Sequence, residues 1–325
     1  MNVVLCGATG LVGQEILSVL EKRNFPIDTL IPVASEKSIG KKITFKDKQY
    51  VICSVEDALN SSADIALFSA GGDFSKKYAQ DFAKKGIRVI DNSSAWRMDE
   101  QVKLIVPEVN GHDLVDSDMI ISNPNCSTIQ LVMILKPLHE KYGIERVIVS
   151  TYQSITGTGK AAVDQMESER AGKDSLKAYP HQIDQNCLPH CDVFLDNDYT
   201  KEEMKLVNES RKILGINNLK LTATAVRVPV IRGHSESVNI QLKNSFDLTD
   251  LKSILEGADG VVVYDDPAKN KYPMPIHAQG KDEVFVGRIR KDNSIENGLN
   301  LWIVADNLRK GAATNAVQIA ELLNK

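Results

Sequence analysis

The first 126 residues alternate between short apolar runs and segments in which apolar residues recur at helical spacing. Val3-Val4-Leu5 predicts a fully buried strand, and the apolar positions from Leu11 to Leu20 predict a helix. Further apolar runs predict strands at residues 30–34, 65–69, 88–91 and 119–122, with helical stretches between several of them. Repeated strand-then-helix units are typical of an α/β domain with a parallel sheet.

The pattern changes after residue 126. Strand-like segments follow one another with few helices between them, at residues 147–152, 219–230, 238–242, 261–264, 284–286 and 299–304. This pattern predicts an α+β domain with a mixed or antiparallel sheet. The last helix, residues 312–323, is rich in apolar residues and could close back onto the first domain. We therefore expect one domain from residues 1–126 with 310–325, and a second domain from 127–309.

A glycine-rich turn joins the first strand to the first helix. Gly7-Ala8-Thr9-Gly10-Leu11-Val12-Gly13 has the spacing G-x-x-G-x-x-G, a variant of the commoner G-x-G-x-x-G dinucleotide motif. The early glycines permit a tight turn and a close approach of backbone N–H groups to a pyrophosphate, while Gly13 lets helix and strand pack closely. The turn predicts a Rossmann-type, doubly wound sheet. The residues expected to contact the cofactor here are Thr9, Gly10, Leu11 and Val12.

The end of the second predicted strand bears on the choice of cofactor. Ser35, Lys37 and Ser38 offer the hydroxyls and the cation that a 2′-phosphate needs, so they favour NADP. Glu36 argues against NADP, because an acid at this place opposes a 2′-phosphate. The cluster could also be only a solvated polar turn. Asp73 is an unexpected acid after the small residues of the third strand's loop. Further contacts with the cofactor are expected from Gly71, Gly72, Gly157 and Asn315.

Asn125-Cys126-Ser127 places a thiol where an apolar helix begins. A helix N-terminus favours thiolate over thiol and lowers the pKa of the sulfur from its reference of about 8.5. A thiolate is the form that attacks a carbonyl, so Cys126 is a candidate nucleophile. The competing interpretation is a buried structural cysteine, because free Cys is among the most buried residue types.

A histidine and a glutamine complete a possible catalytic set. His234 follows a predicted strand and lies beside glycine and hydroxyl residues, and its reference pKa of about 6.5 suits a general base. An imidazolium there would stabilise a neighbouring thiolate. Gln153 follows the strand after the nucleophile helix, where its amide could orient a substrate carbonyl. Either residue by itself would be more often a surface or structural side chain.

Composition narrows the class of protein. The chain has 325 residues, 42% of them hydrophobic and 25% charged, with a formal net charge of −4. Scattered Lys and Arg argue against nucleic-acid binding. No apolar run reaches the roughly 18–20 residues of a membrane span, and the N-terminus lacks the pattern of a signal peptide. Five widely spread cysteines suit free thiols, so we expect a reducing, cytoplasmic compartment.

Seven segments in register resemble aspartate-semialdehyde dehydrogenase, a match that spans nearly the whole chain. They are residues 7–13, 93–98, 123–128, 152–153, 202–205, 227–234 and 311–318. The resemblance implies a cytoplasmic homodimer that reduces L-aspartyl 4-phosphate with NADPH to aspartate semialdehyde and phosphate. This step lies at the branch toward lysine, threonine and methionine, the pathway that also supplies diaminopimelate.

The resemblance also assigns roles to individual residues. It makes Cys126 the nucleophile, His234 the acid/base and Gln153 the residue that positions the reacting group. A substrate with a carboxylate, a phosphate and an ammonium group needs a guanidinium fork, cations and an acid. The residues expected to bind these groups are Arg227 for the carboxylate, Arg97 with Lys205 for the phosphate, Glu202 for the amine, and also Asn125.

Three other functions remain open at this point. N-acetylglutamyl-phosphate reductase shares the nucleotide fold, cysteine and histidine, but an acylated amine needs no Glu202. A nucleotide-sensing scaffold without chemistry and a thiol hydrolase without dinucleotide are further alternatives. Glu202 and Lys205 could also be only a surface ion pair. Cys187, His190 and Cys191 lack a fourth ligand at the usual spacing, so we expect no metal.

Overall fold

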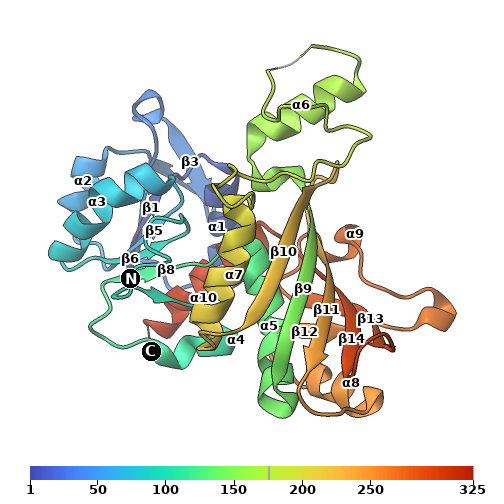
Figure 1. Cartoon of the computed structure of the whole chain (residues 1–325). Helices are drawn as coiled ribbons and strands as arrows, with labels where there is room; N and C mark the ends of the chain where they lie inside the picture. The colour runs from blue at the N-terminus through green and yellow to red at the C-terminus, as the bar shows by residue number, and fades with distance from the viewer. Residues whose placement is uncertain (175, 325) are drawn as a thin grey trace. The chain divides into compact units, whose positions relative to one another are not determined.

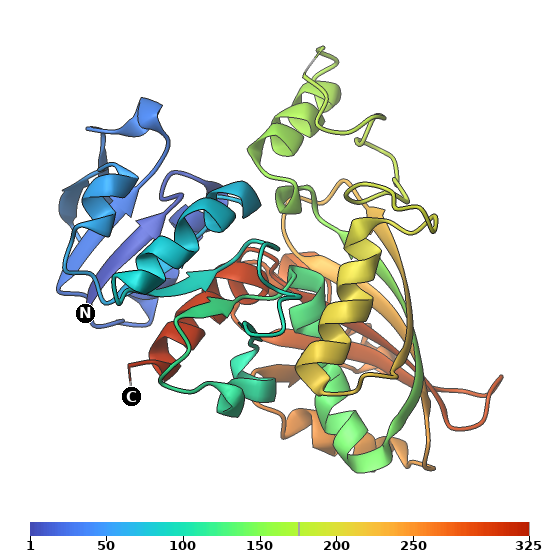
Figure 2. The same ribbon diagram turned by 60° about the vertical axis from the view of Figure 1, so that its left-hand side comes forward.

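The computed structural model describes residues 1–174 and 176–324. It divides the chain into two compact units, Met1–Asn125 with Ala312–Lys325 and Cys126–Gly311 (Figures 1 and 2). Within the described residues, no helix is long and apolar enough to cross a membrane.

The first unit is built on a six-stranded parallel sheet, which confirms the predicted doubly wound α/β fold. Its strands lie in the order β2-β1-β5-β6-β8-β7. A separate hairpin, β3–β4, was not predicted from the sequence, where its polar residues hide the strands. The strands are β1 (Asn2–Cys6), β2 (Thr29–Val33), β3 (Lys42–Phe45), β4 (Lys48–Val51), β5 (Ile65–Phe68), β6 (Arg88–Asp91), β7 (Lys103–Leu104) and β8 (Ile120–Ser122). The helices are α1 (Leu11–Lys22), α2 (Val55–Leu59), α3 (Gly72–Lys84), α4 (Pro107–Asn110) and α10 (Thr314–Leu322).

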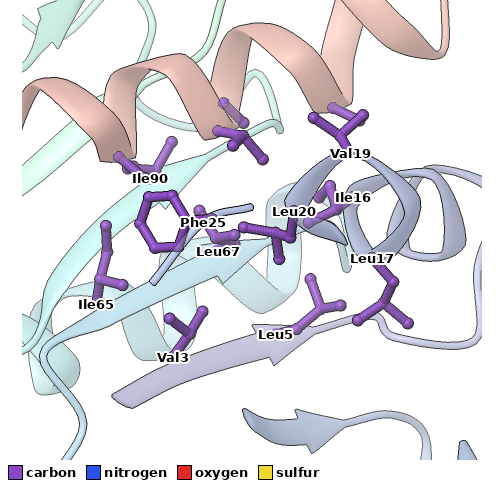
Figure 3. Packing of buried hydrophobic residues seen from close by; sticks show 14 of the residues in the cluster. Val3, Leu5, Ile16, Leu17, Val19, Leu20, Phe25, Ile65, Leu67 and Ile90 are labelled. Carbon is purple, nitrogen blue, oxygen red and sulfur yellow. The ribbon is translucent and has the colours of Figure 1, made fainter. Parts of the chain in front are cut away.

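The apolar core of this unit fills the space between the sheet and two helices that are far apart in sequence. Figure 3 shows Val3 and Leu5 of β1 and Ile65 and Leu67 of β5 on one side, with side chains of α1 opposite. Residues of α10 belong to the same cluster, so the C-terminal helix packs beside α1. Arg23 and Glu321 form an ion pair with N–O distances of 2.6–2.7 Å that joins the ends of these helices.

The second unit contains a mixed six-stranded sheet, the type of sheet that the sequence predicted. Its strands lie in the order β10-β9-β11-β14-β13-β12. In both views α6 lies beyond the ends of β9 and β10 (Figures 1 and 2). Its helices are α5 (Cys126–Tyr142), α6 (Lys160–Arg170), α7 (Lys201–Leu214), α8 (Leu248–Glu256) and α9 (Pro275–Ala278). Its strands are β9 (Ile144–Gln153), β10 (Lys220–Arg227), β11 (His234–Leu242), β12 (Val261–Val263), β13 (Val284–Asp292) and β14 (Gly298–Ala305).

Strand direction brings three polar residues to one edge of this sheet. β9 and β10 run parallel and end at the paired residues Gln153 and Arg227. β11 runs antiparallel to β9 and begins at the same edge with His234. His234 therefore starts a strand, whereas the sequence suggested that it follows one. β10 stops at Arg227 because Pro229 cannot donate to a ladder, and Gly233 turns the chain with a φ of +92°.

Candidate active site

The thiol of Cys126 lies at the first position of α5, as the sequence predicted. Residues 121–125 and 127–135 are buried around it, while Cys126 itself keeps partial exposure. The thiol is therefore accessible at the start of a buried helix, unlike a purely structural cysteine. Gly311 packs directly against it, because a Cβ at Gly311 would stand 2.8 Å from the Cβ of Cys126.

Gln153 connects the nucleophile helix to the first turn of α7. Its side chain is 1% exposed, and its amide nitrogen donates toward Ser127 Oγ at 3.2 Å and Glu202 Oε1 at 3.1 Å. Thr151 Oγ1 is a third acceptor at 3.3 Å. The carboxylate of Glu202 accepts only, so this contact fixes the amide nitrogen toward α7 and leaves the Gln153 oxygen facing elsewhere.

Glu202 and Lys205 are not an exposed surface pair. Lys205 Nζ lies 2.9 Å from Glu202 Oε2 and 2.8 Å from Asp192 Oδ2, and the side chain of Glu202 is 9% exposed. Burial lowers the pKa of Lys205, but the carboxylates of Glu202 and Asp192 raise it by more. Lys205 is therefore a fixed cation beside the acid that contacts Gln153.

A capping box holds the start of α7 in place. Thr200 and Glu203 each accept a hydrogen bond from the other's backbone N–H, the pattern expected of a T-x-x-E sequence. Glu203 Oε1 also accepts from the backbone N–H of Ala225 at 2.9 Å. This contact anchors the first turn of α7, and with it Glu202, to the strand that ends at Arg227.

Arg227 is a buried guanidinium held from several sides. Its Nη1 donates to Ser154 O at 2.7 Å, and its guanidinium carbon lies 5.9 Å from the centre of the Tyr179 ring. The backbone of Arg227 exchanges two hydrogen bonds with Leu188, at 2.8 and 2.9 Å. Its Nε, completely buried, has no hydrogen-bond partner among the described residues. A buried guanidinium with an unused donor suits an anionic ligand.

His234 is fully buried, and its orientation is set by Ser154. The backbone N–H of Ser154 donates to Nδ1 at 3.0 Å, so a neutral ring carries its proton on Nε2. Burial, reinforced by the nearby charge of Arg227, lowers the pKa of His234 to about 3, while Glu202 acts in the opposite direction. The ring is therefore neutral at physiological pH, which corrects the expectation of an imidazolium. Its Nε2 has no hydrogen-bond partner in the described part of the chain.

Asn307 supports this arrangement and was not found from the sequence. Its Oδ1 accepts from Ser154 Oγ at 2.9 Å and from the N–H of Gly233 at 3.0 Å. Its Nδ2 donates to Thr156 Oγ1 at 3.1 Å. The side chain of Asn307 thus links the segment that follows β9 to the residue that precedes β11. An asparagine in a loop after β14 carries no pattern that would reveal this role.

Gly157 occupies the space between Arg227 and His234. A Cβ at this position would lie 2.9 Å from Nη1 of Arg227 and 3.3 Å from Nε2 of His234. Gly157 is one of the residues that we expect to contact the cofactor. The structure places it against two polar side chains of the second unit.

The glycine turn of the first unit fits a dinucleotide. Gly7 has a φ of +85°, and a Cβ there would overlap the carbonyl oxygen of Ser69. A Cβ at Gly13 would overlap the carbonyl oxygen of Gly7, so helix and turn pack without room for a side chain. A cavity of about 470 Å³ opens beside the turn. Its walls include Thr9, Gly10, Ser35, Glu36 and Tyr78.

The other expected cofactor residues occupy different kinds of position. Lys37 and Ser38 lie in a short 3-10 helix after β2, and Leu11 and Val12 begin α1. Gly71 caps α3 with a φ of +89°, and Gly72 is the first residue of that helix.

Three expected ligand-binding residues of the first unit are buried. Asn315 Nδ2 donates to Ile105 O at 2.9 Å and to Asn123 Oδ1 at 2.6 Å. Arg97 is buried and donates to Asn92 O at 2.8 Å. Asn125, also buried, precedes the thiol in sequence.

The cysteine and histidine group near residue 190 does not gather as metal ligands do. Cys187 is exposed, Cys191 is buried, and His190 stacks on Phe194 with ring centres 4.4 Å apart. Burial raises the pKa of Cys191 to about 11, against the effect of Arg227. Among the described residues, no three His, Cys, Asp or Glu side chains come together to hold a metal ion.

Two family models match the two parts of the chain. A semialdehyde dehydrogenase NAD binding domain matches residues 2–117, and a semialdehyde dehydrogenase dimerisation domain matches residues 135–310. The aspartate-semialdehyde dehydrogenase of Aquifex aeolicus is 54% identical over all of this chain and 98% of its own.

Solved structures show the same likeness. Aspartate semialdehyde dehydrogenase II of Vibrio cholerae, complexed with ASA, is 45% identical, with a TM-score of 0.94 over 99% of this chain and 98% of its own. The aspartate semialdehyde dehydrogenase of Candida albicans, with NADP, is 26% identical, with a TM-score of 0.78 over 100% and 99% of the two chains. This chain belongs to the aspartate-semialdehyde dehydrogenase family.

Proposed function

We propose that this chain catalyses the reversible reduction of L-aspartyl 4-phosphate to L-aspartate 4-semialdehyde and phosphate, as a step toward lysine, threonine and methionine. The observation that carries the proposal is the buried link from Ser127, next to Cys126, through Gln153 to Glu202. This link joins a nucleophile to an acid suited to an α-ammonium group. Because Glu202 suits a free ammonium group, the link favours L-aspartyl 4-phosphate over N-acetylglutamyl phosphate, whose amine is acylated.

Covalent chemistry at Cys126 explains the need for a thiol. The thiolate attacks the acyl carbon, a C–S bond forms, and the C–O bond to phosphate breaks with the electron pair leaving on phosphate. Bound NADPH would supply the hydride that reduces the resulting thioester. The tetrahedral oxyanion then re-forms C=O and expels the thiolate, which restores Cys126 and releases the aldehyde.

His234 assists as a hydrogen-bond donor. Because Nδ1 accepts from Ser154, the proton on Nε2 is the one available to an oxyanion formed at Cys126. Backbone N–H groups at the start of α5 can donate to the same oxygen. The proton stays on Nε2 in both directions of the reaction, so the ring ends each cycle neutral.

The polar residues of the second unit match the charged groups of the substrate. Arg227, with its unused Nε, binds the α-carboxylate as a planar fork. Glu202 is a buried carboxylate beside Gln153 and Lys205, so it is the acid of this unit that suits the ammonium group. Lys205 serves the phosphate together with Arg97. Gln153 and Asn125 orient the reacting acyl group.

The nucleotide in this proposal is NADP(H), held by the glycine turn and the residues after β2. Ser35 lines the cavity beside that turn, and Lys37 is the middle residue of the short 3-10 helix that follows Ser35. Glu36 also lines the cavity and opposes a 2′-phosphate, so the preference rests on Lys37. We expect Lys37→Glu to lower kcat/KM for NADP⁺ far more than for NAD⁺. The matched control Lys48→Glu, on exposed β4, should alter neither. An equal loss with both nucleotides would remove Lys37 from the site.

A homodimer is the proposed assembly, with the uncovered face of the second sheet as the contact. α5 packs on β9, β11 and β14 on one side. The alternate residues on the other side stay partly exposed, and the rings of Tyr152 and Trp302 pair there at 5.3 Å. Light scattering should give twice the mass of one chain. Ser237→Arg should yield monomers, and Glu256→Arg on α8 should not. If Ser237→Arg still formed dimers, the interface would not lie on this face of the sheet.

The decisive experiment for the reaction uses purified protein and two aldehydes. Aspartate semialdehyde with NADP⁺ and phosphate should give NADPH formation that depends on phosphate. N-acetylglutamate semialdehyde should give none. Turnover of the acetylated aldehyde alone would overturn the proposal in favour of the reductase alternative. The five cysteines are thiols and not disulfides, in keeping with a reducing cytoplasm as the site of this activity.

A further inference from the structure

Two buried polar side chains behind the active site have no part in the mechanism above. Glu236 on β11 is fully buried, and Gln130 on α5 is 1% exposed. Neither carboxylate oxygen of Glu236, nor either amide atom of Gln130, has a hydrogen-bond partner among the described residues. Buried polar atoms without partners are uncommon in folded proteins, so each such group calls for a reason.

The two side chains are neighbours. Burial raises the pKa of Glu236 well above its usual value, and the amide of Gln130 is the polar group that partly opposes this shift. Burial therefore favours the neutral acid form of Glu236, a form that can donate as well as accept. A carboxylic acid and an amide can form a matched pair of hydrogen bonds after a small movement of either side chain.

Gln130 and Glu236 each share a helix or strand face with one of the reacting residues. Gln130 lies four residues after Cys126, so it occupies the same face of α5 one turn along. Glu236 lies two residues after His234, so it shares the inner face of β11. Each member of the pair thus lies on the same element, and on the same face of it, as one of the two reacting residues.

The surroundings of Glu236 show that a polar side chain is not needed there to fill the core. Its partners across the sheet are Thr151 on β9 and Ile303 on β14. The next inward residues of β11 are apolar and buried, Val238 and Ile240. An apolar side chain at position 236 would fit this layer without leaving polar atoms unpaired. The polar pair therefore serves something other than stability.

We propose that Glu236 and Gln130 form a positioning pair that sets α5 against β11 and so fixes the Cys126 thiol relative to the His234 imidazole. The inference rests on the proposed function, because it requires these two groups to react together. Gln130 and Glu236 lie close to the first residues of α5 and β11. A small shift of the helix or the strand there would change the distance between the sulfur of Cys126 and Nε2 of His234.

The test compares variants of the full chain. Glu236→Gln keeps the size of the side chain and its ability to donate and accept hydrogen bonds, so its kcat should stay close to that of the wild type. The double variant Glu236→Met/Gln130→Met removes the polar pair at similar volume. We expect it to be as heat-stable as the wild type, with KM nearly unchanged and kcat lower by about tenfold to a hundredfold.

A control double variant, Ile134→Met/Ile240→Met, alters the packing of the same helix and strand further from their first residues. Its kcat should remain near that of the wild type. A Glu236→Met/Gln130→Met protein with normal kcat would overturn the inference, as would an equal loss in the control. A Glu236→Gln variant as impaired as the double variant would overturn it too.

A second readout needs no turnover, so it separates this inference from the proposed function. The rate at which iodoacetamide alkylates Cys126, followed by mass spectrometry, should change several-fold in Glu236→Met/Gln130→Met and stay constant in Glu236→Gln. An unchanged alkylation rate in the double variant would contradict the positioning role. A wild type inactive on aspartate semialdehyde would contradict the proposed function instead.

Discussion

The backbone N–H of Ser154 donates to Nδ1 of His234 over 3.0 Å, and this one contact determines which ring nitrogen faces the site. An accepting Nδ1 leaves the neutral ring with its proton on Nε2. Ser154 O also accepts from Arg227 at 2.7 Å. Ser154, the residue after β9, thus orients both the imidazole of His234 and the guanidinium of Arg227. It holds these two side chains in a fixed position relative to each other.

The acid stability of the protein should depend on His234. In the fold the ring stays neutral down to about pH 3, because its pKa is lowered to about 3 by burial and by Arg227. In the unfolded chain it takes up a proton below about pH 6.5. The unfolded state binds more protons in this window, so the free energy of unfolding falls as pH drops through it and is fully retained above it.

We therefore expect acidification from about pH 7 to about pH 5 to lower the free energy of unfolding through this residue by about 2 kcal/mol. His234→Gln should lack that contribution, and the exposed His112→Gln should retain it. Urea denaturation of the three proteins at both pH values measures the difference. Equal losses in wild type and His234→Gln would show that His234 is charged in the folded state.

Cys126→Ser should abolish turnover and leave the Kd for NADP⁺ close to the wild-type value. A hydroxyl is a far weaker nucleophile than a thiolate, so kcat should fall by at least about a thousandfold. Cys187→Ser, at an exposed position, should keep full activity. Stopped assays and nucleotide fluorescence titration supply the two measurements. Retained activity in Cys126→Ser would exclude the thioester mechanism.

Arg227→Lys should damage the use of aspartate semialdehyde more than the chemical step. A lysine cannot reproduce a planar fork or the contact with Ser154 O, so KM should rise by about tenfold or more while kcat changes less. The control Arg290→Lys, on exposed β13, should leave both constants unaltered. Steady-state kinetics with the aldehyde varied provide the comparison. A wild-type KM in Arg227→Lys would remove this residue from the carboxylate site.

Gly13→Ala should disrupt the first strand–turn–helix unit. The added Cβ would overlap the carbonyl oxygen of Gly7, a backbone atom that cannot move away cheaply. We expect a loss of several kcal/mol in the free energy of unfolding, together with loss of nucleotide binding. Gly257→Ala, whose Cβ would come no closer than 3.5 Å to a neighbour, should be tolerated. Calorimetry that found the two variants equally stable would contradict the packing described for α1.

Local pattern was sufficient for the elements that lie close together in sequence. The run Val3-Val4-Leu5 followed by the glycines of residues 7–13 predicts β1, a tight turn and α1 because backbone conformation and burial are decided within a few residues there. The start of α5 at Cys126 was equally readable, since a polar segment gives way to an apolar helix. The hairpin β3–β4 was missed because its strands are short and mostly exposed.

The chemistry of the site depended on contacts between distant residues. The sequence by itself determined the two sheet types, the thiol at a helix start and the identity of the charged residues. Only the tertiary structure decided that His234 is neutral, that Gln153 contacts Glu202, and that Asn307 supports Ser154. Burial and hydrogen-bond partners come from strand direction and register across many residues, and no local pattern encodes them.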